Sequence, residues 1–254
     1  MMAYNYGKSL DVNSGGSTAG GIYGSRPVVG DPNADGPAFS NFNLMHRFIA
    51  SANYSIEYAK HLKTTIGAFL TVNSGFHYSY TYSSDVNGDG QTNDLMYIPT
   101  NQSEISLAAD PATGRTAAQV WSQLDAFISQ DPYLSKHRGA FAERNGARTP
   151  GNSQLDLRLL QDFFVDVKGK RNTLQLSLDI FNFGNLIDPN WGVVKSANRS
   201  QPLGLVSISA AGVPTYTMGL QNNASLTPYT NSFANNTGIT SRWQMQVGLR
   251  YIFN

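Results

Sequence analysis

Residues 242–254 read RWQMQVGLRYIFN, and in this stretch apolar and polar side chains alternate almost without interruption. The odd positions carry Trp243, Met245, Val247, Leu249, Tyr251 and Phe253. The even positions carry mainly arginine, glutamine and glycine. Because successive side chains of a β-strand point to opposite faces, this alternation predicts a strand with one apolar and one polar face.

The same two-residue period recurs elsewhere in segments that are long for strands of a globular protein. The six predicted strands lie at residues 2–6, 48–58, 65–82, 155–167, 173–180 and 242–254. Within the segment 65–82 the apolar face continues as far as Tyr78, Tyr80 and Tyr82. The sequence therefore predicts an all-β protein made of two-faced strands.

The connections between the predicted strands alternate between short and long. Tight turns are predicted at 59–63 and 168–172, whereas the other links span about 11–42, 83–152 and 187–241. Outer-membrane barrels combine short periplasmic turns, long extracellular loops, and strands that are apolar outward and polar inward. A soluble sandwich has no reason for such unequal loops. We therefore predict about six antiparallel strands of a transmembrane β-barrel in outer-membrane lipid, with the C-terminus on the periplasmic side.

This orientation places two groups of aromatic side chains near the membrane surfaces. The predicted periplasmic group comprises Tyr58, Phe163, Phe164, Tyr251 and Phe253, and the predicted outer group comprises Tyr78, Tyr80 and Tyr82. The alternative is that aromatic residues simply favour strands. The polar faces are expected to line the barrel interior, with Arg47, Asn53, Glu57, Asp156, Arg158, Asp162, Gln175, Asp179, Gln246 and Arg250.

The amino-acid composition argues against a nucleic-acid-binding protein, an ordinary soluble domain and a disulfide scaffold. The 18 Lys and Arg against 17 Asp and Glu give a net charge of +1, which does not favour a nucleic-acid partner. Charged residues make up only 14% of the chain, below the roughly 25% of soluble domains. The absence of cysteine excludes disulfides and thiolate sites.

Enzyme signatures are not found in the sequence. The four histidines, His46, His61, His77 and His137, lie in different segments, with neither an HExxH motif nor a GxSxG nucleophile elbow. We therefore expect no catalytic residues. A serine and histidine pair assembled from separate strands, for instance with His77, is the remaining enzymatic alternative.

Six strands are too few to close a membrane barrel, because single-chain bacterial barrels begin at about eight. An open sheet would expose two unpaired edges to lipid, which is costly without water. We therefore expect residues 1–254 to be the C-terminal segment of a larger barrel. The signal peptide, the plug and the earlier strands are expected to lie outside this sequence.

Several blocks of the chain resemble the C-terminal barrel of TonB-dependent outer-membrane receptors, specifically the Oar-like branch. These blocks are YNYGKSLDVNSG (4–15), FNLMHRFIASANYSI (42–56), GFHYSYTYSSDVNGDGQTNDLMYIP (75–99), AFISQDPYLSKHRGAFAERNGARTP (126–150), LDIFNFGNLIDPNWG (178–192) and SRWQMQVGLRYIFN (241–254). They cover most of the chain in the order in which the family has them.

The resemblance implies a receptor that binds a ligand at extracellular loops and imports it through the barrel with energy from the TonB complex. Contact with TonB is implied through the plug region, which is expected to lie outside residues 1–254. The last strand resembles the signal read by the barrel-assembly machinery, carried by Trp243, Val247, Leu249, Tyr251 and Phe253, although Asn254 follows the near-terminal phenylalanine. The alternative function is an adhesin or surface-interaction barrel without active transport.

The stretch from Asp85 to Asp94, DVNGDGQTND, resembles a calcium-binding loop. Asp85, Asn87 and Asp89 occupy the first, third and fifth positions and a glycine the sixth, as calcium loops require. The backbone carbonyl of Gln91 and the side chain of Asp94 are candidates to complete the oxygen shell. A glutamate is missing at the twelfth position, and an Asp/Asn/Gly-rich turn is the alternative.

The second long link also contains helical and basic signals. Apolar side chains at helical spacing in residues 116–130 predict a short helix, which serves either as part of a ligand lid or simply for packing. The basic residues that follow include Arg138, Arg144 and Arg148, which are candidates for an anionic ligand or lipopolysaccharide phosphates, with solvated loop charge as the alternative. In the third link, segments 203–209 and 213–220 predict a hairpin above the membrane.

Overall fold

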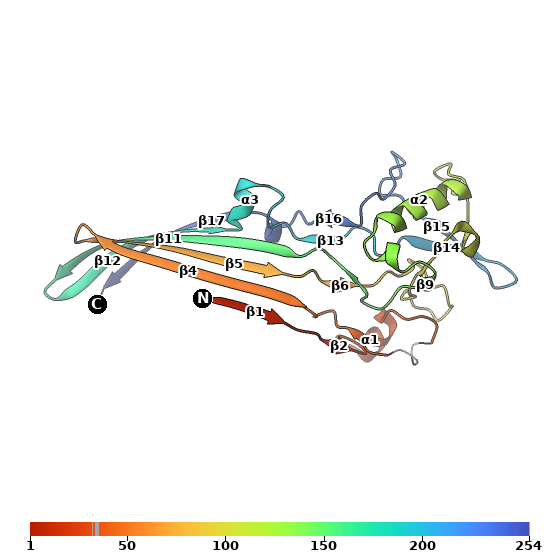
Figure 1. The fold of residues 1–254 in the computed structure, drawn as a ribbon, viewed down its shortest axis with the longest axis horizontal. Coiled ribbons are helices and arrows are strands. Elements are labelled where there is room, and N and C mark those ends of the chain that lie inside the picture. Colours follow the sequence, from red (N-terminus) through yellow and green to blue (C-terminus); the bar gives the residue numbers. More distant parts are fainter. Residues whose placement is uncertain (32, 34–35, 254) are drawn as a thin grey trace.

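A long antiparallel sheet joins a compact unit at one of its ends in the computed structural model, which describes residues 1–31, 33 and 36–253 (Figure 1). The strands of the sheet are β1 (Met2–Tyr6), β4 (His46–Tyr58), β5 (Leu62–Asn73), β11 (Asn152–Val167), β12 (Lys170–Phe181) and β17 (Gln244–Phe253). They pair in the order β1-β4-β5-β11-β12-β17, and every pair is antiparallel. The six predicted antiparallel strands are therefore confirmed, while Asn254 lies outside the described residues.

The compact unit is built from the three long connections and is called the loop domain here (residues 7–45, 74–151 and 188–243). Its helices are α1 (Ala19–Ser25) and α2 (Ala117–Gln130), with the 3-10 helices η1 (Gln102–Glu104), η2 (Leu134–Lys136) and η3 (Ile239–Ser241). Its strands are β2 (Leu10–Asp11), β3 (Ala38–Phe39), β6 (His77–Tyr78), β7 (Tyr97–Ile98), β8 (Ser106–Leu107), β9 (Ala140–Phe141), β10 (Ala147–Arg148), β13 (Lys195–Ala197), β14 (Leu203–Ile208), β15 (Pro214–Met218) and β16 (Phe233–Asn235). The helix α3 (Phe183–Ile187) lies beside the sheet. None of the described helices has the length and apolar character needed to cross a membrane.

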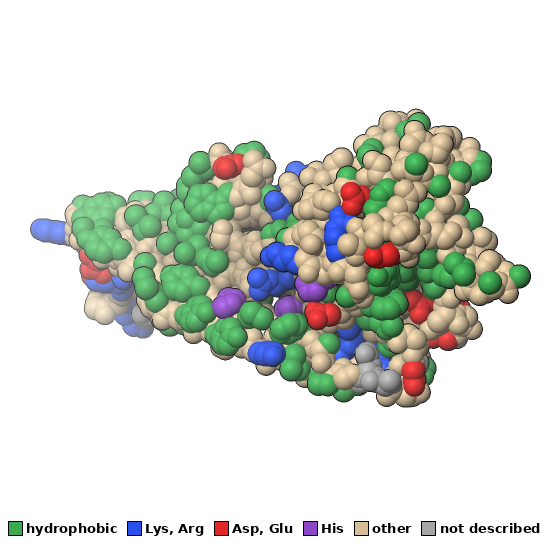
Figure 2. Space-filling view, turned by 45° about the vertical axis from the view of Figure 1, so that its right-hand side comes forward, with side chains coloured by type: hydrophobic (Ala, Val, Ile, Leu, Met, Phe, Trp, Pro, Cys, Tyr) green, Lys and Arg blue, Asp and Glu red, His purple; other side chains and the backbone are tan. Residues whose placement is uncertain are grey.

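The register of the sheet joins the apolar sides of the strands into one continuous face. One row across the strands consists of Tyr54, Ile66, Leu159, Leu178 and Val247, which are direct partners in neighbouring strands. The next row toward the hairpin turns consists of Ile56, Thr64, Gln161, Leu176 and Leu249. Hydrophobic side chains cover much of the sheet, and basic side chains and histidines gather where the sheet meets the loop domain (Figure 2).

The apolar face has the height of an outer-membrane hydrocarbon band. On β4 it runs from Phe48 to Tyr58, a separation of ten residues. At about 3.3 Å per residue and a tilt of about 40°, ten residues rise about 25 Å along the membrane normal. Gln161 is a polar exception on this face, and it is satisfied by the hydroxyl of Thr64, which donates to its Oε1 at 2.6 Å.

Tight turns join the strands at the end of the sheet far from the loop domain. Lys168 and Gly169 form a two-residue turn between β11 and β12, with φ angles of 52° and 78°. Positive φ at both positions is the geometry of the type I′ turn, which matches the twist of antiparallel strands. Ala59 and Lys60 adopt similar angles, 51° and 61°, between β4 and β5. Both turns lie within the predicted ranges and are shorter than predicted.

The prediction of a strand over 65–82 was wrong in its second half. The strand β5 ends at Asn73, and a Cβ on Gly75 would lie 1.6 Å from the backbone oxygen of Thr149, so the chain there abuts the segment leading into β11. Tyr80 and Tyr82 are buried inside the loop domain and Tyr78 packs against them, so these tyrosines do not form an outer aromatic girdle.

Of the five aromatic residues predicted near the periplasmic membrane surface, all but Phe164 lie on the apolar face at the turn end of the sheet, and their place at a membrane surface stays a prediction. Tyr58, Phe163, Tyr251 and Phe253 are exposed on the apolar face. Phe164 belongs to the opposite face, where the guanidinium of Arg171 lies 4.1 Å from its ring centre and the ring is buried. Successive side chains of a strand point to opposite faces, so Phe163 and Phe164 cannot both lie on the apolar face.

A basic residue on the apolar face should weaken insertion, whereas the same residue one position earlier should not. We expect Val247→Arg to destabilise the protein in lipid by about 2–4 kcal/mol, the cost of arginine near the bilayer midplane. Gln246→Arg is the matched control, since Gln246 lies on the polar face of the same strand. Urea unfolding of the full-length protein in lipid vesicles measures both, and equal effects would contradict the assignment of the two faces.

Candidate functional site

The loop domain has a hydrophobic core of its own, to which both the second and the third connections contribute. The helix α2 buries Val120, Leu124, Phe127 and Ile128, which confirms the predicted helix. Its start is set by a capping box, in which the side chain of Thr116 and that of Gln119 each bond the backbone of the other. The core also includes Leu203, Tyr216 and Met218 from the hairpin β14–β15, which was predicted correctly as a hairpin. The long loops therefore form a packed unit.

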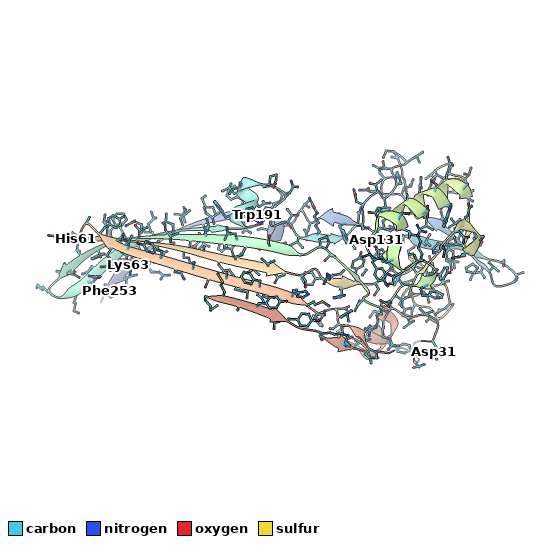
Figure 3. The ribbon with its side chains drawn as sticks, viewed as in Figure 1. Asp31, His61, Lys63, Asp131, Trp191 and Phe253 are labelled. Carbon is cyan, nitrogen blue, oxygen red and sulfur yellow. The ribbon has the colours of Figure 1, made fainter. Side chains whose placement is uncertain are left out.

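A buried polar network lies within this core, and Figure 3 shows its residue Asp131 in the loop domain, far from His61 and Phe253 at the turn end of the sheet. The hydroxyl of Tyr80 donates a hydrogen bond of 2.6 Å to Asp131 Oδ2, and that of Tyr78 donates to Tyr80 at 3.0 Å. The other carboxylate oxygen, Asp131 Oδ1, accepts the backbone N–H of Tyr133 and of Leu134. Burial raises the pKa of Tyr80, so the phenol stays a neutral donor.

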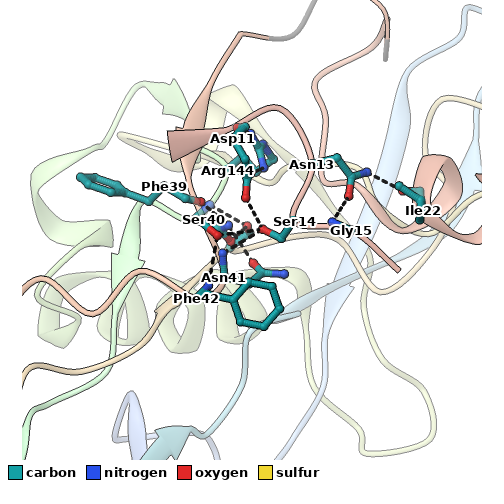
Figure 4. Close-up of polar contacts among 12 residues, drawn as sticks. Asp11, Asn13, Ser14, Gly15, Ile22, Phe39, Ser40, Asn41, Phe42 and Arg144 are labelled. Carbon is teal, nitrogen blue, oxygen red and sulfur yellow. Dashed lines mark hydrogen bonds and ion pairs between the residues drawn. The ribbon is translucent and has the colours of Figure 1, made fainter. Parts of the chain in front are cut away.

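The first connection is fastened to the second by polar contacts (Figure 4). Arg144 forms an ion pair with Asp11, with Nη1 3.1 Å from Oδ1, and the hydroxyl of Ser14 donates to Asp11 Oδ2 at 2.7 Å. Partial burial acts to raise the pKa of Asp11, but the hydrogen bonds from Ser14, Ser40 and Arg144 lower it overall. The imidazole of His77 stacks on Phe39 at 4.3 Å. The first connection is therefore part of the loop domain.

The three candidate anion-binding arginines make contacts to different segments. Arg138 forms an ion pair of 2.7 Å with Asp125 on α2 and donates to the backbone oxygen of Pro99. Arg144 is bound to Asp11, and Arg148 lies with Nη1 3.8 Å from the sulfur of Met45. These contacts tie the loop domain together. Anion binding by Arg138, Arg144 and Arg148 stays a prediction.

The predicted calcium loop folds back on itself through its own side chains. Asp85 accepts the backbone N–H of Gly88 and of Gly90, at 2.7 and 2.8 Å, and both glycines have positive φ. Asn87 Oδ1 accepts the N–H of Asp89, and Asp89 Oδ1 accepts the N–H of Gln91. The side-chain oxygens of Asp85, Asn87 and Asp89 therefore each accept a backbone N–H within one short turn.

Asp94 is the one buried carboxylate of this loop. Its Oδ2 accepts the N–H of Val86 at 2.8 Å, and burial raises its pKa, with Asp89 and Asp85 adding to the rise. Among the described residues, however, no three His, Cys, Asp or Glu side chains converge as a ligand group for a metal ion. Any calcium at this loop must therefore take amide and backbone oxygens as well, and its binding stays a prediction.

The polar face of the sheet carries paired charges, and the register places the predicted interior residues on it. Arg158 Nε lies 2.5 Å from Asp179 Oδ1, and Gln175 donates to Asp162 Oδ1 at 2.8 Å. Gly67 lies opposite Arg158, and a Cβ there would come within 2.7 Å of Asn53 Oδ1. A hollow of about 290 Å³ lies beside the ion pair of Arg158 and Asp179.

The last strand presents the predicted assembly signal on an exposed edge. Trp243 lies just before β17, and Val247, Leu249, Tyr251 and Phe253 are all exposed on the apolar face, with 65% exposure at Val247 and 73% at Phe253. The strand β17 pairs with β12 on one side and is an edge of the described sheet. An edge strand with exposed aromatic residues suits recognition by strand pairing.

A cavity of about 420 Å³ opens in the loop domain, and its walls come from all three connections. Two aromatic pairs line it: Tyr82 stacked on Tyr216 with ring centres 4.8 Å apart, and Tyr97 edge-to-face with Phe141 at 5.3 Å. Among the described residues that line it, the charged ones are Asp94 and Glu104. The amino-acid sequence does not indicate this cavity, because its lining residues are scattered over residues 28–216 and share no motif.

The comparison with protein families agrees with this architecture. Residues 1–242 match the model of the outer membrane beta barrel domain, so the chain belongs to that family and is an outer-membrane protein. No curated protein and no solved structure matches the chain.

Calcium is expected to stabilise the loop domain through the 85–94 turn. If the ion binds there, adding 1 mM calcium to the full-length protein in EDTA-treated detergent should raise the unfolding temperature of the loop domain, followed by tryptophan fluorescence in a variant that keeps Trp121 and replaces Trp191 and Trp243 by phenylalanine. Asp89→Asn removes one anionic ligand and should abolish most of the rise. Asp110→Asn, at an ion pair with Arg115 outside the 85–94 turn, is the control. An unchanged unfolding temperature in the unsubstituted protein would contradict calcium binding.

Proposed function

We propose that this chain is part of a TonB-dependent receptor, which binds a ligand at the loop domain and imports it through the barrel. The observation that carries the proposal is a prefolded loop domain with an open cavity, at one end of a sheet with an apolar face and a polar face. The sequence blocks that resemble the Oar-like branch agree with it. In this proposal further strands pair with β1 and β17 to close the barrel, and the chain performs no catalysis.

The charge pairs of the polar face fit an interior that holds a plug. Arg158 and Asp179 neutralise one another, so the wall presents hydrogen-bonding groups without a strong net field. A plug with polar side chains can pack against such a wall and be released from it without separating a buried ion pair. The TonB complex would act on that plug, and the barrel-assembly machinery on β17.

Orientation can be tested with single cysteines, since residues 1–254 contain none. We place the loop domain outside the cell and the turns with the C-terminus in the periplasm. A membrane-impermeant maleimide should therefore label Ala211→Cys, in the turn between β14 and β15, on intact cells. Lys168→Cys, in the turn between β11 and β12, should react only after the outer membrane is permeabilised. The reverse pattern would contradict the orientation.

Transport can be tested without knowing the ligand. The depletion of small molecules from a complex medium is compared between cells with and without the full-length gene, and again in cells that lack TonB. We expect a defined set of solutes to be depleted only when both genes are intact. Leu124→Asp should abolish this depletion by disrupting the core of the loop domain, whereas Ser122→Asp on the exposed side of α2 should not.

A surface-interaction barrel is the second candidate, because apolar side chains are exposed near the tip of the hairpin β14–β15. Val206, Ile208 and Val213 are each about half exposed there. If this function holds, the gene should change the attachment of cells to surfaces or to other cells, and solute depletion should not depend on it. That outcome would contradict transport.

A further inference from the structure

The 420 Å³ cavity of the loop domain has the size and lining of a small-molecule site. Most of the lining is apolar or aromatic, including Leu95, Ile105 and Pro214. Its volume is well within the range of about 300–1,000 Å³ found for ligand pockets. A ligand would therefore be held largely by burial of apolar surface, and the few polar groups would select its chemistry.

The charged groups at the cavity are of one sign. Asp94 and Glu104 lie in its wall, and no Lys, Arg or His belongs to the described residues that line it. Asp85 and Asp89 belong to the same turn as Asp94, whose Oδ2 accepts the N–H of Val86 at 2.8 Å, and they add negative charge beside this wall. A cationic ligand is therefore favoured and an anionic one is repelled.

The carboxylate of Glu104 is oriented by its hydrogen bonds and can accept a further one from such a ligand. Its Oε2 accepts the backbone N–H of Thr100 at 2.8 Å and the hydroxyl of Tyr97 at 3.1 Å. Its Oε1 accepts the side-chain amide of Asn101 at 3.1 Å, and a carboxylate oxygen has a second lone pair. The carboxylate is thus oriented by three donors before any ligand arrives.

The aromatic pairs complete the complementarity to an organic cation. The faces and edges of Tyr82, Tyr216, Tyr97 and Phe141 offer stacking surface for a flat apolar body. A positive charge near an aromatic face gains about 0.5–2 kcal/mol more. Carboxylates and aromatic rings side by side in one cavity suit an amine with an apolar body better than a neutral or acidic molecule.

We propose that this cavity binds a small organic cation, an aromatic or aliphatic amine whose ammonium group pairs with Glu104 and whose apolar body lies among the tyrosines and Phe141. That this amine is also the ligand imported through the barrel rests on the proposed function. Binding itself requires neither TonB nor transport.

Calorimetric titration of the full-length protein in detergent tests the site with three probes of similar shape: tryptamine, which is cationic, tryptophol, which is neutral, and indole-3-acetate, which is anionic. The titrations are run in EDTA, so that calcium does not compete for Asp94. We expect tryptamine to bind at least tenfold more tightly than tryptophol, and indole-3-acetate not to bind. Equal affinities for tryptamine and tryptophol, or no binding of tryptamine, would overturn the proposal.

Two substitutions locate the binding. Glu104→Gln keeps the acceptor for Thr100 and removes the charge, and it should weaken tryptamine binding at least tenfold while leaving tryptophol unchanged. Glu143→Gln is the matched control at an exposed carboxylate that does not line this cavity, and it should leave both affinities unchanged. Unchanged tryptamine affinity in Glu104→Gln would overturn the proposal.

Val213→Trp provides a second route that does not disturb the charge. Val213 is in the cavity wall and half exposed, so a larger side chain there can fill the opening without entering the core. Loss of tryptamine binding supports the site, and retained binding overturns it. Tryptamine binding without TonB-dependent uptake supports the site and contradicts amine import. TonB-dependent uptake of other solutes, with no amine binding, overturns this inference and leaves the proposed function standing.

Discussion

Pairing of the backbone in an environment without water is the constraint on which the rest of this structure depends. Every strand that crosses hydrocarbon must have its N–H and C=O groups bonded to neighbouring strands. In this chain the same register that satisfies those groups also aligns the apolar rows across six strands. A slip of one residue in β12 would turn Asp179 toward lipid and Leu178 inward, so hydrogen bonding and side-chain placement specify one arrangement.

The loop domain follows from that arrangement. Because β5 and β11 are neighbours in the sheet, the segments next to them run side by side. The backbone N–H of Thr149 donates to the backbone oxygen of Phe76, and the N–H of Phe76 donates to Thr149 Oγ1. The strands β12 and β17 deliver the third connection to the same region. The second and third connections, which are distant in sequence, are thereby held close enough to bury a common core. The first connection is fastened to the second by the ion pair of Asp11 with Arg144.

Local periodicity predicted the membrane strands, the helix α2 and the hairpin β14–β15, because each depends on residues near one another in sequence. It failed at Tyr80 and Phe164. A two-residue period shows that a strand has two different faces, but lipid and a protein core both accept an apolar side chain, so the pattern alone did not separate them. The cavity and the contacts of Arg138 and Arg144 depend on packing between distant segments, and no local pattern carries that information.

The core shared by the second and third connections also bears on how barrels of this family diversify. Phe127 comes from one connection and Met218 from the other, and both are fully buried in the same cluster. If recombination with a related gene exchanged only one connection, the side chains of the new connection would not be complementary to those of the other in the shared core. Loop exchange between barrels of this kind should therefore succeed when both connections are inherited as a pair, while single substitutions accumulate at the hairpin tip and the cavity rim.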